Sequence, residues 1–212
     1  MIAVVNVTLA EHAYVEIRDR LVMLDIRPGA PLNDEMLAAE LGIGRTPVRE
    51  AFKRLEGDRL VVAYPRRGTF ATAVDITDLA HISEIREQLE PLAAARAASR
   101  ATPAVRAELA ELAESLADLR GEPRDVLRRD VQVHRDVYRA AGNPHLEDVL
   151  VRQDNLATRI WCLFLDRLPS LPGHVSEHAA LLHAIVAGDE AAAADLARAH
   201  VIGFERAIRA LL

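Results

Sequence analysis

Two residues with metal-binding side chains lie one helical turn apart in the middle of the sequence. Asp130 and His134 are separated by four positions. On an α-helix that spacing puts both residues on one face, about 5–6 Å apart, so a carboxylate and an imidazole can bind the same cation. Two later predicted helices each carry one further histidine, His178 and His200. One Asp and three His form a ligand set suited to zinc first, or to nickel or manganese.

The other histidines have simpler interpretations. A single histidine on a helix is usually a capping or surface residue. This interpretation is given to His12, His81, His145 and His174. His183 lies five residues after His178, too far around a helix to share its face, and is left outside the site. Spacing alone leaves open whether the four candidate ligands bind a metal or are capping and surface residues as well.

The elements that must position these side chains are helical. Beyond Val74 the pattern is helical throughout, with no further strand signal and a high alanine and leucine content. Turn and cap residues, such as Thr102-Pro103 and Gly142-Asn143-Pro144, separate the segments. Six helices are expected, over residues 78–100, 103–120, 124–141, 144–167, 176–188 and 189–212. They predict one bundle that carries all four candidate ligands.

The N-terminal quarter has a different organisation. Three helices are predicted there, over residues 9–24, over residues 34–41, and from residue 47 to residue 57 or 58. Asn33 is a suitable N-cap for the second helix, and Gly42 ends it. Thr46 followed by Pro47 is expected to begin the third helix, with Thr46 as its N-cap.

The third predicted helix has two distinct faces. Val48, Phe52 and Leu55 form the stripe that is expected to face inward. The cationic residues recur every four positions on another face, and they are expected to face outward. These residues are Arg45, Arg49 and Lys53.

A β-hairpin is predicted after the third helix. Its strands are expected over residues 60–64 and 69–74, joined by an arginine-rich turn at Pro65–Gly68. Helices followed by a hairpin are the order of a winged helix-turn-helix, whose recognition helix enters the major groove of DNA. The predicted fold is therefore mainly α: an N-terminal winged helix-turn-helix with a small β-hairpin wing (residues 1–74), followed by an all-α helical-bundle effector domain (residues 75–212).

Charge and composition support this division. The net charge is −6, but residues 1–74 hold ten basic and ten acidic residues, so the acidic excess lies C-terminal. Residues 45–70 hold seven basic side chains and three acidic ones, a patch that a phosphate backbone would attract. The alternative is an ordinary solvated helix face. The single cysteine, Cys162, excludes an internal disulfide, and with no targeting or membrane segment a cytoplasmic location is expected.

The run Leu41–Val61 (LGIGRTPVREAFKRLEGDRLV), with Pro28-Gly29 before it and Arg67-Gly68-Thr69 after it, resembles the DNA-binding domain of GntR-family regulators. The resemblance implies that Arg45 and Arg49 reach bases and phosphates, that Thr46 holds a phosphate, and that Gly68 lies against the minor groove. Lys53, Arg54 and Arg66 are further candidates for phosphate contact, with an ordinary surface position as the alternative. Gly44, where the family usually has Ser or Thr, and Glu35, where some members use a DNA-contacting Arg, are departures that are expected to alter affinity or operator choice.

The remainder resembles the FCD (FadR C-terminal domain) subgroup of the same family. The matching pieces are Arg86–Glu90, Asp130 with His134, Gly142-Asn143-Pro144, and the stretch Glu177–His200. The resemblance implies a divalent metal held by the Asp and three His, with a small carboxylate or sugar acid, rather than a long acyl-CoA, bound against it. Arg86, Asn155 and Arg159 are candidates to bind the other oxygens of that effector, with surface salt bridges as the alternative.

These features predict a homodimeric transcription regulator that acts as a repressor. It is expected to bind a pseudo-palindromic double-stranded DNA operator and to release it when the effector binds. Two alternatives are a metal-dependent, hydrolase-like enzyme in which the same ligands activate water, and a regulator that senses the metal itself. No general-base or nucleophile motif supports the enzyme.

Overall fold

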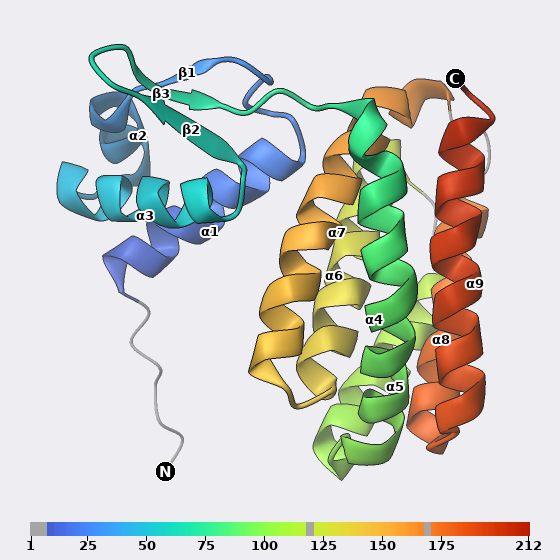
Figure 1. Ribbon diagram of the computed structural model, residues 1–212. Coiled ribbons are helices and arrows are strands. Elements are labelled where there is room, and N and C mark those ends of the chain that lie inside the picture. The colour runs from blue at the N-terminus through green and yellow to red at the C-terminus, as the bar shows by residue number, and fades with distance from the viewer. Residues whose placement is uncertain (1–7, 118–120, 168–170) are drawn as a thin grey trace, which may run out of the picture. The chain divides into compact units, whose positions relative to one another are not determined.

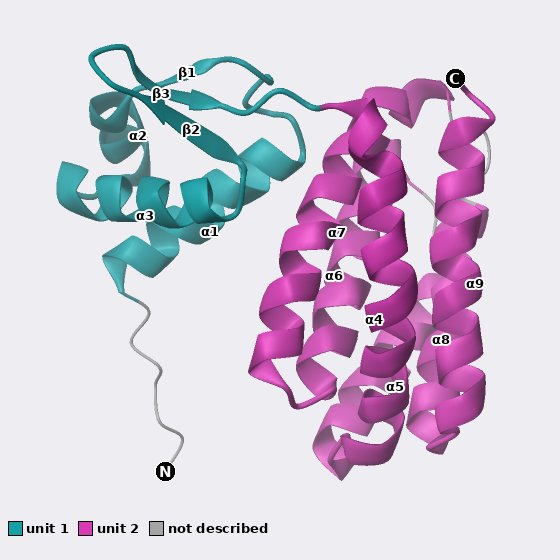
Figure 2. Ribbon diagram, in the orientation of Figure 1, with its two compact units in different colours: residues 1–74 teal, residues 75–212 magenta. Residues whose placement is uncertain are grey.

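The computed structural model describes residues 8–117, 121–167 and 171–212. The chain divides into two compact units, residues 1–74 and residues 75–212 (Figure 2). Three sequence predictions fall outside the described residues: the character of the opening Met1–Asn6, the end of a helix at Arg120, and a break at Pro169-Ser170.

The helices of the first unit pack around the third of them (Figure 1). They are α1 (Leu9–Val22), α2 (Asp34–Leu41) and α3 (Arg45–Gly57). Val48 and Leu55 of α3 are fully buried and Phe52 is 8% exposed, as the predicted inward stripe requires. These side chains pack where α3 contacts α1 and α2.

The predicted start of the third helix is wrong by two residues. Thr46 is not the N-cap; Gly44 is, in an extended conformation, and Arg45 is already helical. Gly44 has no side chain, so the N-cap position supplies no side-chain acceptor to the first turn. Thr46 is exposed within the first turn of α3. The positive end of the helix dipole lies at this turn, so an anion bound there would be stabilised.

The wing is a three-stranded antiparallel sheet in the order β1-β3-β2. Its strands are β1 (Pro31–Leu32), β2 (Val61–Tyr64) and β3 (Gly68–Ala71). The hairpin was predicted, whereas β1 was not, because two residues beginning with proline show no strand alternation. Gly68 opens β3 opposite Tyr64 with φ +99°, a backbone conformation that favours glycine.

The second unit is a helical bundle, which confirms the predicted fold class (Figure 1). Its elements are η1 (Ile76–Asp78), α4 (Leu79–Arg100), α5 (Pro103–Ala117), α6 (Pro123–Ala140), α7 (Pro144–Phe164), η2 (Leu165–Arg167), α8 (Leu171–Ala187) and α9 (Glu190–Arg209). Helix α4 is central, because it packs against α6, α7, α8 and α9. Ala93, Ala94, Ala97 and Ala98 of α4 are fully buried, and their small side chains let neighbouring helices approach closely.

Helix α8 begins at Leu171, five residues before the predicted start at Ser176. Pro172 and Gly173 suggested a loop, but proline is tolerated in a first turn, where its missing N–H has no intrahelical acceptor. Arg106 of α5 donates hydrogen bonds from Nη1 to the carbonyl oxygens of Ile185 and Val186, both at 2.7 Å, near the other end of α8. The longer α8 brings His174 into the interior.

Within the described ranges, the helices are all too short or too polar to cross a membrane.

Candidate metal centre and DNA-binding surface

The four predicted ligands meet inside the bundle. Asp130 and His134 come from α6, His178 from α8 and His200 from α9, and one ligand atom of each lies within 4.8 Å of the others. Asp130 Oδ1 is 3.6 Å from His178 Nδ1, and Asp130 Oδ2 is 3.8 Å from His134 Nε2. All four residues are at least nine-tenths buried. Side chains from three helices therefore meet in one buried polar cluster.

Several atoms of this cluster lack hydrogen-bond partners among the described residues. They are Asp130 Oδ1, both ring nitrogens of His178, and His200 Nδ1. Leaving a buried polar atom unpaired costs about 1–3 kcal/mol, so a group of them at one point calls for a ligand. A divalent cation fits, because Asp130 Oδ1, one ring nitrogen of His178 and His200 Nδ1 can each offer a lone pair to it.

The electrostatics of the cluster favour the same interpretation. Burial lowers the pKa of His178 to about 3, and burial likewise lowers the pKa values of His134 and His200 well below the usual range. The three imidazoles are therefore neutral near pH 7, the form that binds metal. Burial, followed by repulsion from Asp154, raises the pKa of Asp130. A cation beside that carboxylate would favour its ionised form.

Hydrogen bonding orients His134 toward the centre of the cluster. Tyr138 Oη donates to Glu90 Oε1 at 2.8 Å and lies 3.1 Å from His134 Nδ1. Because the only proton of the hydroxyl goes to the carboxylate, its oxygen is left to accept from a protonated Nδ1. That tautomer leaves Nε2 of His134, 3.8 Å from Asp130 Oδ2, without a proton, so its lone pair can bind a metal.

Arg86 of α4 lies directly beside the cluster. Its Nη2 is 3.4 Å from His134 Nε2 and 3.7 Å from Asp154 Oδ1, and its Nε donates to Glu90 Oε1 at 2.5 Å. Burial alone would lower the pKa of Arg86, but Glu90, Tyr138 and Asp154 together raise it. A permanently charged guanidinium is thus held next to the candidate metal position.

The other two candidate effector residues are also interior. Asn155 and Arg159 on α7 are 0% and 1% exposed, and Arg86 is 3% exposed, so the alternative of surface salt bridges is wrong. Asn155 accepts a hydrogen bond from Arg135 Nη2 at 2.6 Å, and its Nδ2 lacks a hydrogen-bond partner among the described residues. Burial lowers the pKa of Arg159 to about 10, so it stays charged at neutral pH.

His174 does not have the surface role predicted for it. Its side chain is 10% exposed, its ring stacks on His200 with centroids 4.0 Å apart, and its Nδ1 lies 3.6 Å from Glu177 Oε2. Glu177 Oε2 is also 3.5 Å from His200 Nδ1. His12, His81 and His145 are exposed, and His183, 57% exposed, lies near Glu114 and outside the cluster.

Sequence reasoning missed the supporting residues Glu90, Tyr138 and Asp154. Glu90 lies four residues after Arg86, and Tyr138 four residues after His134, so helical spacing was a usable signal for both. Asp154 had no such signal, because only packing of α7 against α4 brings it to Arg86.

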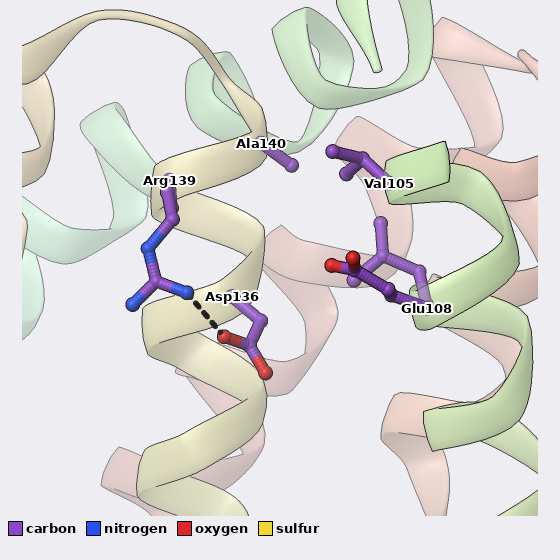
Figure 3. Close-up of a pocket in the computed structure, with 6 residues that line it drawn as sticks. Val105, Glu108, Asp136, Arg139 and Ala140 are labelled. Carbon is purple, nitrogen blue, oxygen red and sulfur yellow. Dashed lines mark hydrogen bonds and ion pairs between the residues drawn. The ribbon is translucent and has the colours of Figure 1, made fainter. Parts of the chain in front are cut away.

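A separate cavity of about 100 Å³ lies between α5 and α6 (Figure 3). Val105 and Glu108 line it from α5, and Asp136, Arg139 and Ala140 from α6. Asp136 and Arg139 form an ion pair at 3.0 Å within it. None of the candidate metal or effector residues lines this cavity.

In the first unit, α3 and the wing share one groove of about 360 Å³, lined by Arg49, Phe52, Lys53, Glu56, Ala63 and Thr69. Glu56 Oε1 accepts from the backbone N–H of Ala63 at 3.1 Å and ties the wing to α3. Arg45, Thr46, Lys53, Arg66 and Gly68 are exposed, as is Arg49. Arg66 occupies the turn of the wing with φ +62°.

Arg54, also on α3, has a different environment. Its Nη1 donates to Glu11 Oε2 at 2.6 Å, and its guanidinium carbon lies 3.8 Å from the centroid of the Tyr14 ring. Arg54 therefore fastens α3 to α1.

The fold is a winged helix-turn-helix unit followed by an all-helical unit that encloses the polar cluster. Residues 9–71 match the model of the bacterial regulatory proteins of the gntR family, and residues 81–203 match the FCD domain. The chain belongs to the GntR family, in the group that carries an FCD domain. These are families of transcriptional regulators and not of enzymes.

Particular relatives agree at the level of fold. The structure of E. coli McbR/YncC superposes with a TM-score of 0.83 at 24% identity, covering 97% of this chain and 99% of that one. A GntR protein from Rhodococcus sp. RHA1 gives a TM-score of 0.71 at 21% identity, covering 96% and 98%.

Curated relatives match over a shorter stretch. An uncharacterized HTH-type transcriptional regulator of Streptomyces ambofaciens is 40% identical over 62 residues, 29% of this chain. The HTH-type transcriptional repressor RspR of Escherichia coli is 30% identical over 66 residues, 31% of this chain. The chain covers 26% and 29% of the lengths of these two proteins.

Proposed function

We propose that this protein is a homodimeric, DNA-binding transcriptional repressor whose operator affinity is set by a small carboxylate or sugar acid. The effector binds at a divalent metal ion, with zinc as the first candidate. The ligands of that metal are Asp130, His134, His178 and His200. The observation that carries the sensing half is the enclosed set of four ligands with unpaired lone pairs. The winged helix-turn-helix and the family carry the DNA-binding half.

The exposed cations of the first unit support binding to duplex DNA. Arg45 and Thr46 lie in the first turn of α3, where the helix dipole attracts phosphate, and Arg49 follows one turn later. Arg49 and Lys53 share the groove between α3 and the wing, and Gly68 leaves the wing without a side chain at that position. Two such units on one dimer would bind the two halves of a pseudo-palindromic operator.

Replacing Arg49 with alanine is expected to weaken operator binding by about 1–3 kcal/mol, the usual loss for a bidentate arginine–guanine contact. The measurement is fluorescence anisotropy with a duplex that the wild-type protein selects from random DNA. Arg100→Ala, which removes the same charge from an exposed position at the end of α4, is the control and should leave affinity unchanged. Equal affinities for the Arg49 variant and the wild type would exclude this face of α3 from the interface.

The residues around the metal position suit an anionic effector. The metal, when bound, would attract one oxygen of a carboxylate. Arg86 holds its charged guanidinium beside His134, where it can pair with an anionic oxygen of the effector. Asn155 of α7 is a further buried donor, since its Nδ2 has no hydrogen-bond partner among the described residues. An effector can change DNA affinity only by binding one arrangement of the DNA-binding units better than another.

The alternative in which the metal itself is the signal makes a different prediction. If the metal anchors an effector, zinc alone should leave operator affinity nearly unchanged, and zinc with small carboxylates or sugar acids should lower it. Titrating zinc into metal-stripped protein, with and without a panel of such acids, while following operator binding separates the two. A full response to zinc alone would favour metal sensing.

A further inference from the structure

Asp34 forms ion pairs with both Arg45 and Arg49, the two arginines that the proposed function assigns to DNA binding. Arg49 Nε donates to Asp34 Oδ2 at 2.5 Å. Arg45 binds the same carboxylate through Nη2 at 3.1 Å and through Nε at 3.3 Å. One carboxylate at the start of α2 thus holds two exposed cations from successive turns of α3.

This carboxylate is not needed to cap its own helix. Asn33 caps α2, because its Oδ1 accepts from the backbone N–H groups of Glu35 at 2.9 Å and Met36 at 3.1 Å. Desolvation raises the pKa of Asp34, but hydrogen bonds from Arg49 and then Arg45 outweigh it and lower the pKa. Its polar contacts are therefore directed at α3.

The geometry leaves the two arginines with different capacities. Asp34 occupies only the Nε–H of Arg49, so both terminal nitrogens of that guanidinium remain for the two acceptors of a guanine edge. Arg45 uses Nε and Nη2 on Asp34, which leaves Nη1 for a phosphate. Without this support each arginine would lose much of its rotamer entropy on binding DNA.

We propose that Asp34 is a specificity-determining, positioning residue that holds Arg45 and Arg49 as one oriented pair and so sets the ratio of operator affinity to non-specific DNA affinity. Its negative charge repels phosphate and weakens binding to any duplex. Its hydrogen bonds orient Arg49 and favour the duplex that offers the matching base edge. The inference rests on the proposed contact of α3 with DNA.

The test compares Asp34→Asn with Glu40→Gln. Glu40 is exposed on the same helix, and its carboxylate pairs with Arg20 at 2.7 Å rather than with Arg45 or Arg49. Affinities are measured for the selected duplex and for a scrambled duplex of equal length and composition, across a salt series. Both substitutions remove one negative charge, so both should raise affinity for the scrambled duplex to a similar extent.

Only Asp34→Asn should lower the ratio of operator to scrambled affinity, by about fivefold or more. Asp34→Glu keeps the carboxylate and should therefore retain part of the wild-type ratio of operator to scrambled affinity. Equal ratios for Asp34→Asn and Glu40→Gln would overturn the proposal while leaving the interface intact. If Arg49→Ala also leaves operator affinity unchanged, the proposed DNA contact itself is wrong.

Discussion

His178→Ala is expected to lower the affinity for zinc by about 100-fold or more, since even changes to residues that only support a ligand cost 10–100-fold. His178 is 1% exposed and within 3.6 Å of Asp130, at the centre of the four-residue cluster. Helical content should persist, because alanine is a strong helix former and leaves the backbone hydrogen bonds of α8 in place. Elemental analysis and zinc titration against a competing chelator measure the loss, and circular dichroism measures the helix content.

The same helix supplies the control. His183→Ala removes an imidazole that is 57% exposed and lies near Glu114, away from the cluster. Its zinc affinity should equal that of the wild type. A His178→Ala protein that retains full zinc occupancy would show that the ligand set is wrong, whereas loss of zinc in both variants would indicate general damage to α8.

The second large effect is expected when Arg86 is replaced, and it concerns the free energy of unfolding. Arg86→Ala should lower the free energy of unfolding by about 3–5 kcal/mol, because removing one partner of a buried ion pair leaves the other charge uncompensated. Arg86 and Glu90 are each 3% exposed and are joined at 2.5 Å, and Asp154, 1% exposed, lies 3.7 Å from the same guanidinium. Urea unfolding of the metal-free protein measures the change without a contribution from metal.

Combining Arg86→Ala with Glu90→Gln tests the cause. If the loss comes from an unpaired carboxylate, removing that charge should recover part of it, so the double variant should be more stable than Arg86→Ala alone. Additive losses in the double variant would instead assign the effect of Arg86 to packing.

Local chemistry was sufficient to predict most elements. Asn33 caps α2 through its own side chain, and Gly42 ends α2 in the left-handed conformation, as expected. The stripe of Val48, Phe52 and Leu55 needs only the helical period, and the pair Asp130 and His134 only a four-residue spacing. Such features depend on neighbours along the chain, so the sequence contains them completely.

The errors arose where local signals compete with packing. Thr46 looked like the N-cap of α3, but Gly44 is the N-cap and the helix begins at Arg45, two residues earlier than predicted. Pro172 and Gly173 looked like a loop, yet α8 extends through them and brings the ring of His174 onto His200. Neither outcome follows from propensity, because energies of a few kcal/mol from tertiary contacts outweigh preferences of a fraction of that size.

The sequence by itself determined the types of element, their order, and the residues able to bind a metal or a phosphate. The tertiary structure decided which of those residues meet. Only packing of α6, α8 and α9 against α4 turns four separate ligands into one enclosed cluster. Only the approach of α2 to α3 joins Asp34 to Arg45 and Arg49. Burial and pairing between distant segments depend on how helices pack, and no spacing along a single helix records that.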